Sequence, residues 1–294
     1  MERRSTAALA AMLLGAALAG AAQTAHGRAY LGFDRNDYPG DAALPALRKS
    51  FRYTGYWLNP PPGETQNSWV GKRATLRRFG FGFLVLFNGR SDAELKAAVR
   101  KGEDAATLGA ADGKAAAEAA AREGFPRGVL IFLDQEEGGR LLAEQAAYVL
   151  AWIDAVRAAG ARAGVYCSGI RVPDGGGAIT TAEDIAEREA ARARSASNPG
   201  RAAPLAIWVA DDECPPSPGC TLAPPRLTAV FSLPEPAYTA AWQYAQSPRR
   251  KQFSGGCPKN DAPDGNCYAP GLKPGANSFV DLDTADAPDP SGGR

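Results

Sequence analysis

Carboxylate side chains at the ends of apolar segments are the residues of this chain best suited to acid–base chemistry. In the clearest case, the apolar run 129–133 is followed at once by Asp134, Glu136 and Glu137. A short apolar run without polar alternation is typical of a parallel strand buried on both faces. Side chains two residues apart share a side of an extended chain, so Asp134 and Glu136 should point together and Glu137 away from them. A helix cap or a solvated acid is the simpler interpretation of any one of these residues.

The same arrangement recurs at other apolar segments. Asp34 ends the first of them, Asp211 follows a later one, and Asp281 and Asp283 belong to the last. If these segment ends meet at one rim, the acids form a cluster in which they cannot all ionise freely, and at least one pKa should rise. Glycoside hydrolysis uses such a set: a protonated carboxyl for the leaving oxygen and a carboxylate for the cationic transition state or for water.

Aromatic side chains lie on or beside the same segments. Sugar rings have apolar faces that pack on aromatic rings, so these side chains are candidates for substrate contact, although a place in the core is the simpler interpretation of any single one. The candidates are Tyr56, Tyr166, Trp208, Trp242 and Tyr244, and Gln243 could bind a hydroxyl or satisfy a buried backbone group.

Strand-like segments that alternate with helical ones are expected to position these side chains. Strands are expected at residues 30–34, 53–59, 81–88, 129–134, 163–167, 205–210, 241–244 and 279–282, and helices at 41–50, 92–123, 140–159 and 181–196. We expect the longest helical segment to break near Gly109 or Gly113, and Thr181 with Asp184 has the form of a capping box. Eight strands in this order fit a single-domain α/β protein, a (β/α) TIM-type barrel. The last third lacks room for crossover helices, so its final strands are expected to be irregular and could run antiparallel.

A doubly wound open sheet is the main alternative fold. It would usually carry a Gly-rich phosphate loop after an early strand, whereas the three glycines at 175–177 follow the fifth strand and are interpreted as a flexible loop. The expected organisation is a signal peptide at 1–25, a barrel domain at 26–285 and a disordered Pro/Gly/Asp-rich tail at 286–294.

The first residues have the pattern of an export signal. Arg3 and Arg4 precede an apolar stretch at 7–19 that is too short to span a bilayer, and residues 19–21 have the small-x-small form of a cleavage site. The residues around the arginine pair match a twin-arginine signal poorly. We therefore expect a secreted, periplasmic or cell-envelope protein. No later segment predicts stable membrane insertion.

Charge and cysteine content narrow the class of protein further. Loss of Glu2, Arg3 and Arg4 leaves 31 basic and 31 acidic residues from totals of 33 and 32, which gives no electrostatic case for nucleic acid. In an exported protein, two local disulfides are predicted, Cys214 with Cys220 and Cys257 with Cys267. Their spacings are not those of a zinc site, and Cys167 is interpreted as a buried thiol.

No cofactor or metal is expected, and histidine chemistry has almost no support. The only histidine, His26, lies beside the expected cleavage site, so a Ser-His-Asp or Cys-His mechanism lacks its base. Clustered acids could also hold calcium or magnesium, but the chain has no EF-hand loop.

Several of these segments together resemble the family 25 glycoside hydrolases, the lysozyme-type muramidases. The resemblance rests on 32–34 (GFD), 134–136 (DQE), 164–168 (GVYCS), 207–210 (IWVA), 242–244 (WQY) and 280–283 (VDLD), which occur in that family's order. The opening 32–40, GFDRNDYPG, is more similar to an exported glycoside hydrolase-like family of unknown function with the same barrel. The resemblance covers about residues 30–283.

The resemblance implies a barrel with five β/α units that acts on or binds cell-wall glycan. By position, Glu136 matches the general acid, and Asp34, Asp134 and Asp281 match the acids around the cleaved bond. The chain departs from the lysozymes at Arg35, which follows Asp34 and could neutralise it, at the additional acid Glu137, and at Asp283, where the lysozymes often carry Asn. These differences bear on activity more than on fold.

Two functions therefore stay open. The first is an exported glycosidase of peptidoglycan or a related polysaccharide, with Glu136 as general acid and with Asp211 and Asp283 among the substrate contacts. The second is a non-catalytic glycan-binding or cell-envelope module on the same barrel. In both, the expected partner is a polysaccharide and the expected state is a monomer.

Overall fold

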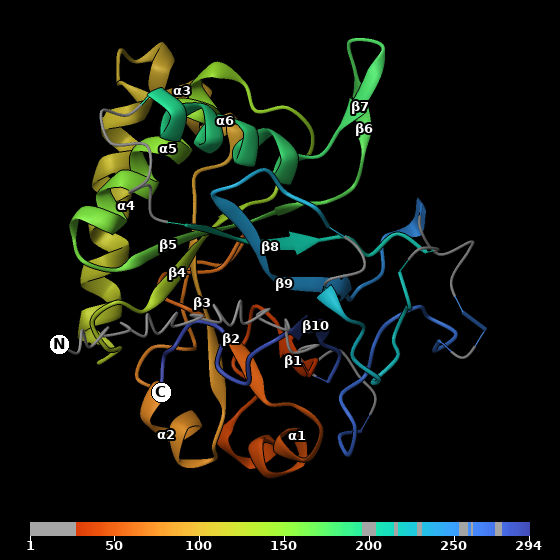
Figure 1. The fold of residues 1–294 in the computed structure, drawn as a ribbon. Helices are drawn as coiled ribbons and strands as arrows, with labels where there is room; N and C mark the ends of the chain where they lie inside the picture. Colours follow the sequence, from red (N-terminus) through yellow and green to blue (C-terminus); the bar gives the residue numbers. More distant parts are fainter. Residues whose placement is uncertain are drawn as a thin grey trace, which may run out of the picture.

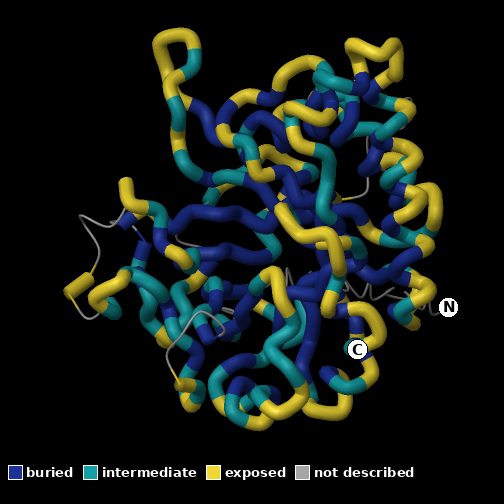
Figure 2. Tube along the Cα trace, turned by 180° about the vertical axis from the view of Figure 1, so that it is seen from behind, coloured by how far each residue is buried: buried dark blue, intermediate teal, exposed yellow. Residues whose placement is uncertain are grey.

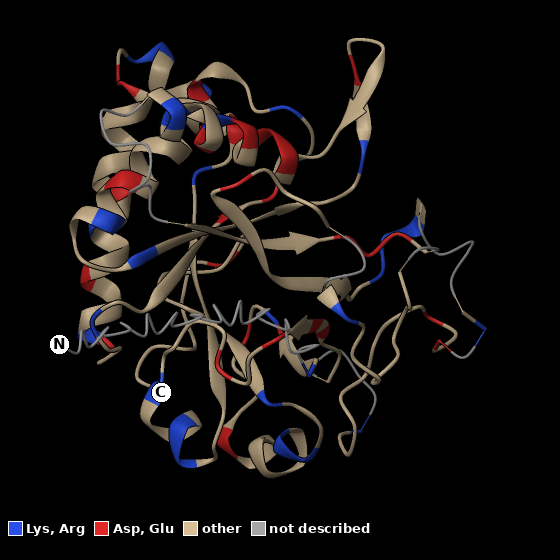
Figure 3. Cartoon of the chain, in the orientation of Figure 1, with Lys and Arg blue, Asp and Glu red and all other residues tan. Residues whose placement is uncertain are grey.

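The structure of the protein is a computed structural model that describes residues 28–195, 204–214, 217–227, 231–252, 258–259, 261–273 and 278–294. The expected signal peptide and Cys257 lie outside these residues. Acidic and basic side chains are spread over the described chain, and α2 carries basic but no acidic side chains (Figure 3). No helix in this part of the chain has the length and hydropathy needed to cross a membrane.

A closed barrel of eight strands forms the centre of the described fold (Figure 1). Its strands are β1 (Tyr30–Asp34), β2 (Tyr53–Trp57), β3 (Gly82–Asn88), β4 (Leu130–Gln135), β5 (Arg162–Ser168), β8 (Leu205–Ala210), β9 (Ala237–Ala245) and β10 (Asp281–Ala285). They close in the order β1-β10-β9-β8-β5-β4-β3-β2. This confirms the predicted TIM-type α/β barrel.

The last strand runs against all the others. β10 pairs antiparallel with both β1 and β9, whereas every other neighbouring pair of barrel strands is parallel. The amino end of β10 therefore lies at the barrel end where the other strands finish. Asp281, its first residue, stands directly opposite Asp34, the last residue of β1. This reversal brings the two acids, far apart in the sequence, to the same rim.

Helices cover the outside of the barrel, with α1 and α2 apart from the group α3 to α6 (Figure 1). They are the 3₁₀ turn η1 (Asp41–Ala43), α1 (Leu44–Ser50), α2 (Arg73–Arg78), α3 (Asp92–Arg100), α4 (Ala105–Arg122), α5 (Ala143–Ala158) and α6 (Thr181–Ser195). A small hairpin, β6 (Val172–Asp174) with β7 (Gly177–Ile179), projects from the barrel where the sequence predicted only a flexible loop. The strands are the most buried part of the chain (Figure 2).

Two local predictions about the helices are wrong. The long helical segment breaks between α3 and α4, where Asp104 caps α4 by accepting the Thr107 N–H at 2.8 Å. Gly109 lies inside α4, at a position where α5 packs too closely for a side chain. A Cβ there would come within 2.1 Å of the Tyr148 carbonyl oxygen on α5. The capping box of α6 is formed one residue earlier than predicted, by Thr180 and Glu183, which exchange hydrogen bonds between their side chains and backbone N–H groups.

The segment 286–294, predicted to be disordered, packs against the barrel. The Ser291 hydroxyl accepts the Val85 N–H at 3.0 Å, and the Ser291 carbonyl accepts the Leu130 N–H at 2.9 Å. Asp289 accepts the Phe83 N–H, and Arg73 donates to the Gly293 carbonyl. Backbone N–H groups where β3 and β4 begin are not paired between these two strands. The tail is ordered because it supplies their acceptors. A composition rich in Pro, Gly and Asp does not reveal this.

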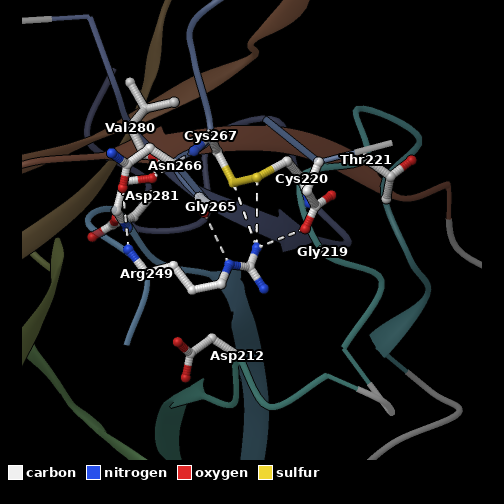
Figure 4. The surroundings of a disulfide bond; sticks show 12 residues. Asp212, Gly219, Cys220, Thr221, Arg249, Gly265, Asn266, Cys267, Val280 and Asp281 are labelled. Carbon is white, nitrogen blue, oxygen red and sulfur yellow. Dashed lines mark hydrogen bonds and ion pairs between the residues drawn. A yellow bond between two sulfur atoms is a disulfide. The ribbon is translucent and has the colours of Figure 1, made fainter. Parts of the chain in front are cut away.

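The disulfide pairing also differs from the prediction. Cys220 bonds Cys267, 47 residues away with a Cα–Cα distance of 5.1 Å, so neither predicted local pair forms. The bond joins the loop after β8 to the loop before β10, and its sulfurs lie over the buried guanidinium of Arg249 (Figure 4). Cys214 is a buried thiol whose sulfur accepts an N–H of Arg249 at 2.8 Å. Sequence spacing cannot show which loops the barrel brings together. Cys167 is buried, as predicted.

Candidate active site

Four of the predicted acids meet at the end of the barrel where the parallel strands finish. Asp34 ends β1, Asp134 lies near the end of β4, Glu136 follows that strand, and Asp281 begins β10. Asp34 is 6% exposed and Asp134 is 5% exposed, whereas Glu136 is exposed at the rim. Buried acids thus surround an acid that solvent and substrate can reach.

Gln243 on β9 holds Asp34 in place. Its Nε2 donates to an oxygen of Asp34 at 2.9 Å and lies 3.5 Å from an oxygen of Asp281. Its own Oε1 accepts from the Tyr166 hydroxyl at 2.7 Å and from Gln246 at 2.8 Å, which fixes the amide orientation. Asp34 packs closely on Gly55 of β2, where a Cβ would lie 2.6 Å from the Asp34 Cβ.

Asp283 lies beneath Asp34 inside the barrel and is fully buried. One of its oxygens accepts from the Trp208 indole N–H at 3.1 Å, and the other has no donor among the described residues. Its interaction with the Asp34 carboxyl favours the protonated form of Asp283 and the ionised form of Asp34. Burial, followed by the charge of Asp34, raises the pKa of Asp283 well above its ordinary value.

The same burial shifts the rest of the cluster. It raises the pKa of Asp34 to about 6, opposed by the hydrogen bonds from Gln243 and Asp283. It also raises the pKa of Asp281 well above its ordinary value, although the Ser247 N–H donates to that carboxylate at 2.5 Å. Asp134 receives no hydrogen bond on either oxygen from the described chain, and burial together with the charge of Glu136 raises its pKa strongly.

Glu136 occupies the junction of three adjoining hollows, with volumes of about 520, 400 and 390 Å³. Partial desolvation, with the nearby charge of Glu137, raises its pKa, and the charge of Arg250 opposes this rise. Glu137, predicted to point away from Glu136, lines the first of these hollows together with it and accepts the Asp92 N–H at the start of α3 at 2.6 Å. Glu136 is thus an accessible carboxyl that keeps its proton to a higher pH than an ordinary glutamate does. Asp34 beside it is a buried acid that ionises near pH 6.

The predicted substrate contacts lie in four different places. Tyr166 and Gln243 reach the mouth, Trp208 and Asp283 lie below it, and Asp211 lines a separate hollow of about 370 Å³. Burial raises the pKa of Asp211 to about 6.

Tyr56, Trp242 and Tyr244 face away from the mouth. The Tyr56 hydroxyl donates to Glu123, the Trp242 indole to the Asp211 carbonyl, and the Tyr244 hydroxyl to the Thr221 carbonyl. Alternation along the strands explains their placement, because Gly55 and Gln243 point inward and their neighbours therefore point outward. These three aromatic residues are part of the packing outside the barrel.

Sequence reasoning missed the polar residues that follow β9. Gln246 bonds the Tyr166 hydroxyl and Gln243, Ser247 bonds Asp281, and Arg250 pairs with the buried Asp212 beside Glu136. They lie in an irregular loop that carries no periodic signal. Proximity to the Trp-Gln-Tyr segment at 242–244 was the only indication available.

Comparisons with known proteins agree with this fold. A family model described as "Rv2525c-like, glycoside hydrolase-like domain" matches residues 51–213. A comparison with curated proteins gave no match.

Three solved structures show the extent of the structural likeness. An uncharacterized B. stearothermophilus protein is 20% identical, with a TM-score of 0.54 over 87% of this chain and 95% of that one. The Mycobacterium tuberculosis Tat-secreted protein Rv2525c in complex with HEPES is 10% identical, with a TM-score of 0.47 over 87% and 94%. A muramidase from Trichobolus zukalii is 12% identical, with a TM-score of 0.44 over 88% and 94%. Since the family model matches more than half of the chain, the protein belongs to the Rv2525c-like, glycoside hydrolase-like domain family.

Proposed function

We propose that this protein is a glycosidase that cleaves a cell-wall polysaccharide of the peptidoglycan class, with Glu136 as its general acid. The observation that carries the proposal is the position of Glu136, an exposed carboxyl of raised pKa at the junction of three hollows and beside buried acids. A chain of sugars could occupy the adjoining hollows with one glycosidic oxygen at Glu136. Family membership supports a glycoside hydrolase-like barrel and leaves activity to be tested.

The proposed reaction uses the two protonation states that the site maintains. Glu136 gives its proton to the glycosidic oxygen as the bond from that oxygen to the anomeric carbon breaks. Asp34, with a pKa of about 6, is ionised at neutral pH and stabilises the positive charge that develops at the anomeric carbon. Water then supplies the hydroxyl to that carbon, and its remaining proton restores the acid.

Gln243 and Asp283 have supporting roles in this proposal. Gln243 fixes the Asp34 carboxylate, and the hydrogen bond with Asp283 lowers the pKa of Asp34 against the effect of burial. Tyr166, through its bond to Gln243, completes a chain of contacts from the mouth to the barrel interior.

The test is release of reducing ends from purified peptidoglycan by the Glu136→Gln variant. Gln has nearly the same shape but carries no proton to donate, so turnover should fall by a factor of about 10² or more while binding to insoluble wall is kept. Glu118→Gln, on the exposed face of α4, is the matched control and should behave like the natural protein. Equal turnover in the Glu136→Gln variant would remove the proposed role.

Glycan binding without cleavage is the second candidate, and the state of Asp34 favours it. This acid is engaged by Gln243 and by Asp283, so it is less available to a substrate than an open carboxylate would be. Wall binding without any release of reducing ends by the natural protein would establish the binding role instead.

We further propose that the protein acts outside the cytoplasm. The signal-like first residues and the disulfide Cys220–Cys267 support this location, because such bonds form and persist in oxidising compartments. Detection of the processed chain in a culture supernatant or envelope fraction tests it.

A further inference from the structure

The largest hollow at the mouth, of about 520 Å³, is strongly acidic, and we call it the acidic hollow. It lies between the loop after β2 and the start of α3. Its charged lining residues are the acids Glu64, Glu94, Asp134, Glu136 and Glu137 and one base, Arg90.

The single base does not balance these acids. The Nε and Nη2 atoms of Arg90 donate to the two carboxylate oxygens of Asp112 at 2.7 and 3.1 Å. Asp112 belongs to α4 and is not among the residues that line the hollow. Asp112 thus largely neutralises the charge of Arg90 from outside the hollow. The acidic hollow therefore keeps a negative potential that favours a cationic ligand.

Asp134 gives an independent indication of a ligand. It is 5% exposed, it lines the acidic hollow, and neither of its oxygens receives a hydrogen bond from the described chain. A buried carboxyl without donors is unfavourable, and native structures generally satisfy such groups. A ligand with positively charged N–H groups would donate hydrogen bonds to the Asp134 oxygens and would stabilise the ionised form of that carboxyl.

The shape and lining favour an amine on a sugar over a metal ion. No cluster of three or more His, Cys, Asp or Glu within the described ranges is arranged to hold a metal. Glu94 and Glu137 are oriented by the backbone N–H groups of Ser91 and Asp92, which they accept at 2.8 and 2.6 Å. Pro61 and Pro62 also line the hollow and add apolar surface on which the face of a pyranose ring could pack.

We propose that the acidic hollow recognises an amino sugar whose nitrogen is unacetylated and protonated, a glucosamine-type unit next to the bond at Glu136. The inference rests on the proposed function only for the position of the cleaved bond. An N-acetyl group is neutral, so it brings no positive charge to Asp134, and it is also larger than an ammonium group. The protein would thereby distinguish de-N-acetylated stretches of a glycan from acetylated ones.

Calorimetric binding of two defined probes tests the inference. The probes are the tetramer of glucosamine and the tetramer of N-acetylglucosamine, measured at pH 6 and low salt with the Glu136→Gln variant so that neither is cleaved. We expect the glucosamine tetramer to bind about tenfold more tightly, with the preference shrinking at 0.5 M salt. Equal affinity for the two tetramers, or a preference for the acetylated one, would overturn the inference.

Variants locate the discrimination in the acidic hollow. In the same background, Glu64→Gln with Glu94→Gln should weaken binding of the glucosamine tetramer about threefold to tenfold and leave the acetylated tetramer unchanged. Gln at position 94 can still complete the α3 capping box, so folding is preserved. Glu118→Gln is the control. Unchanged affinity of the double variant for the glucosamine tetramer would place the recognition elsewhere and contradict the inference.

The outcome is separable from that of the proposed function. Amine-dependent binding together with no hydrolysis by the natural protein would keep the acidic hollow and reject the glycosidase. Hydrolysis with equal affinity for both tetramers would do the reverse.

Discussion

Replacing Asp34 by Asn should make the protein more stable at neutral pH while it removes activity. Asp34 is 6% exposed and its pKa is raised from an ordinary value of 3.8 to about 6, mainly by burial. Each tenfold change in an acid constant corresponds to about 1.4 kcal/mol, so ionising this carboxyl in the folded state costs about 3 kcal/mol more than in the unfolded chain. Asn avoids that cost, because its oxygen can still accept from Gln243 and its N–H₂ can donate to Asp283.

The sign of the pH dependence follows from proton binding. Between pH 3.8 and about 6 the folded state binds the Asp34 proton more tightly than the unfolded state, so natural stability falls as pH rises through that window. The variant lacks this fall. Its advantage should therefore be near zero below pH 3.5, grow through the window, and reach about 3 kcal/mol at pH 7, or roughly 5–10 °C in Tm.

Urea denaturation of the two proteins at a series of pH values measures the difference directly. The exposed Asp37→Asn serves as the control and should give superimposable curves. If Asp34→Asn were equally stable or less stable at pH 7, or if its advantage were the same at pH 3.5, the unfavourable burial of an ionised carboxylate at the mouth would be refuted.

Three further outcomes are expected. Because Asp34 must be ionised and Glu136 protonated, kcat/KM should follow a bell in pH with its acid limb near 6, and an acid limb near pH 4 would contradict the assignment. Ser291→Ala should lower the free energy of unfolding by about 1–3 kcal/mol in urea, because the buried Val85 N–H loses its acceptor; no change would show that the tail contact is dispensable. Replacing Cys220 and Cys267 together by Ser should lower the free energy of unfolding by about 4 kcal/mol, the loop-closure value for a 47-residue separation. As a control, Cys167→Ser should leave the difference in unfolding free energy between the oxidised and the reduced protein unaltered.

The alternation of apolar runs with helical segments was sufficient to predict the barrel. Runs such as 129–133 are too short for helices and lack polar alternation, and the acids after them must then lie at one end of the sheet. The lack of room for crossover helices in the last third predicted that the final strands could run antiparallel, and β10 does so, whereas β9 is parallel to β8. Asp281 reaches the rim only because β10 is reversed.

Predictions failed where tertiary pairing decides the outcome. Tyr56 and Tyr244 are aromatic and lie on the correct strands, but strand alternation turns them outward. Cys220 bonds Cys267 because two loops meet over Arg249, an arrangement that sequence spacing does not encode. Asp134 was identified as an acid of the site, whereas its lack of hydrogen-bond donors became visible only from its surroundings.

The reversal of β10 has a practical consequence for handling the molecule. Tyr30, where β1 begins, pairs with Ala285, where β10 ends. The chain therefore enters and leaves the barrel at one end, and Glu136 lies at the opposite end. A linker to a bead, a sensor surface or a displayed scaffold, attached upstream of Tyr30, would leave the acid-bearing end facing outward. Immobilised protein should therefore engage a bulky, insoluble polymer as readily as the free form.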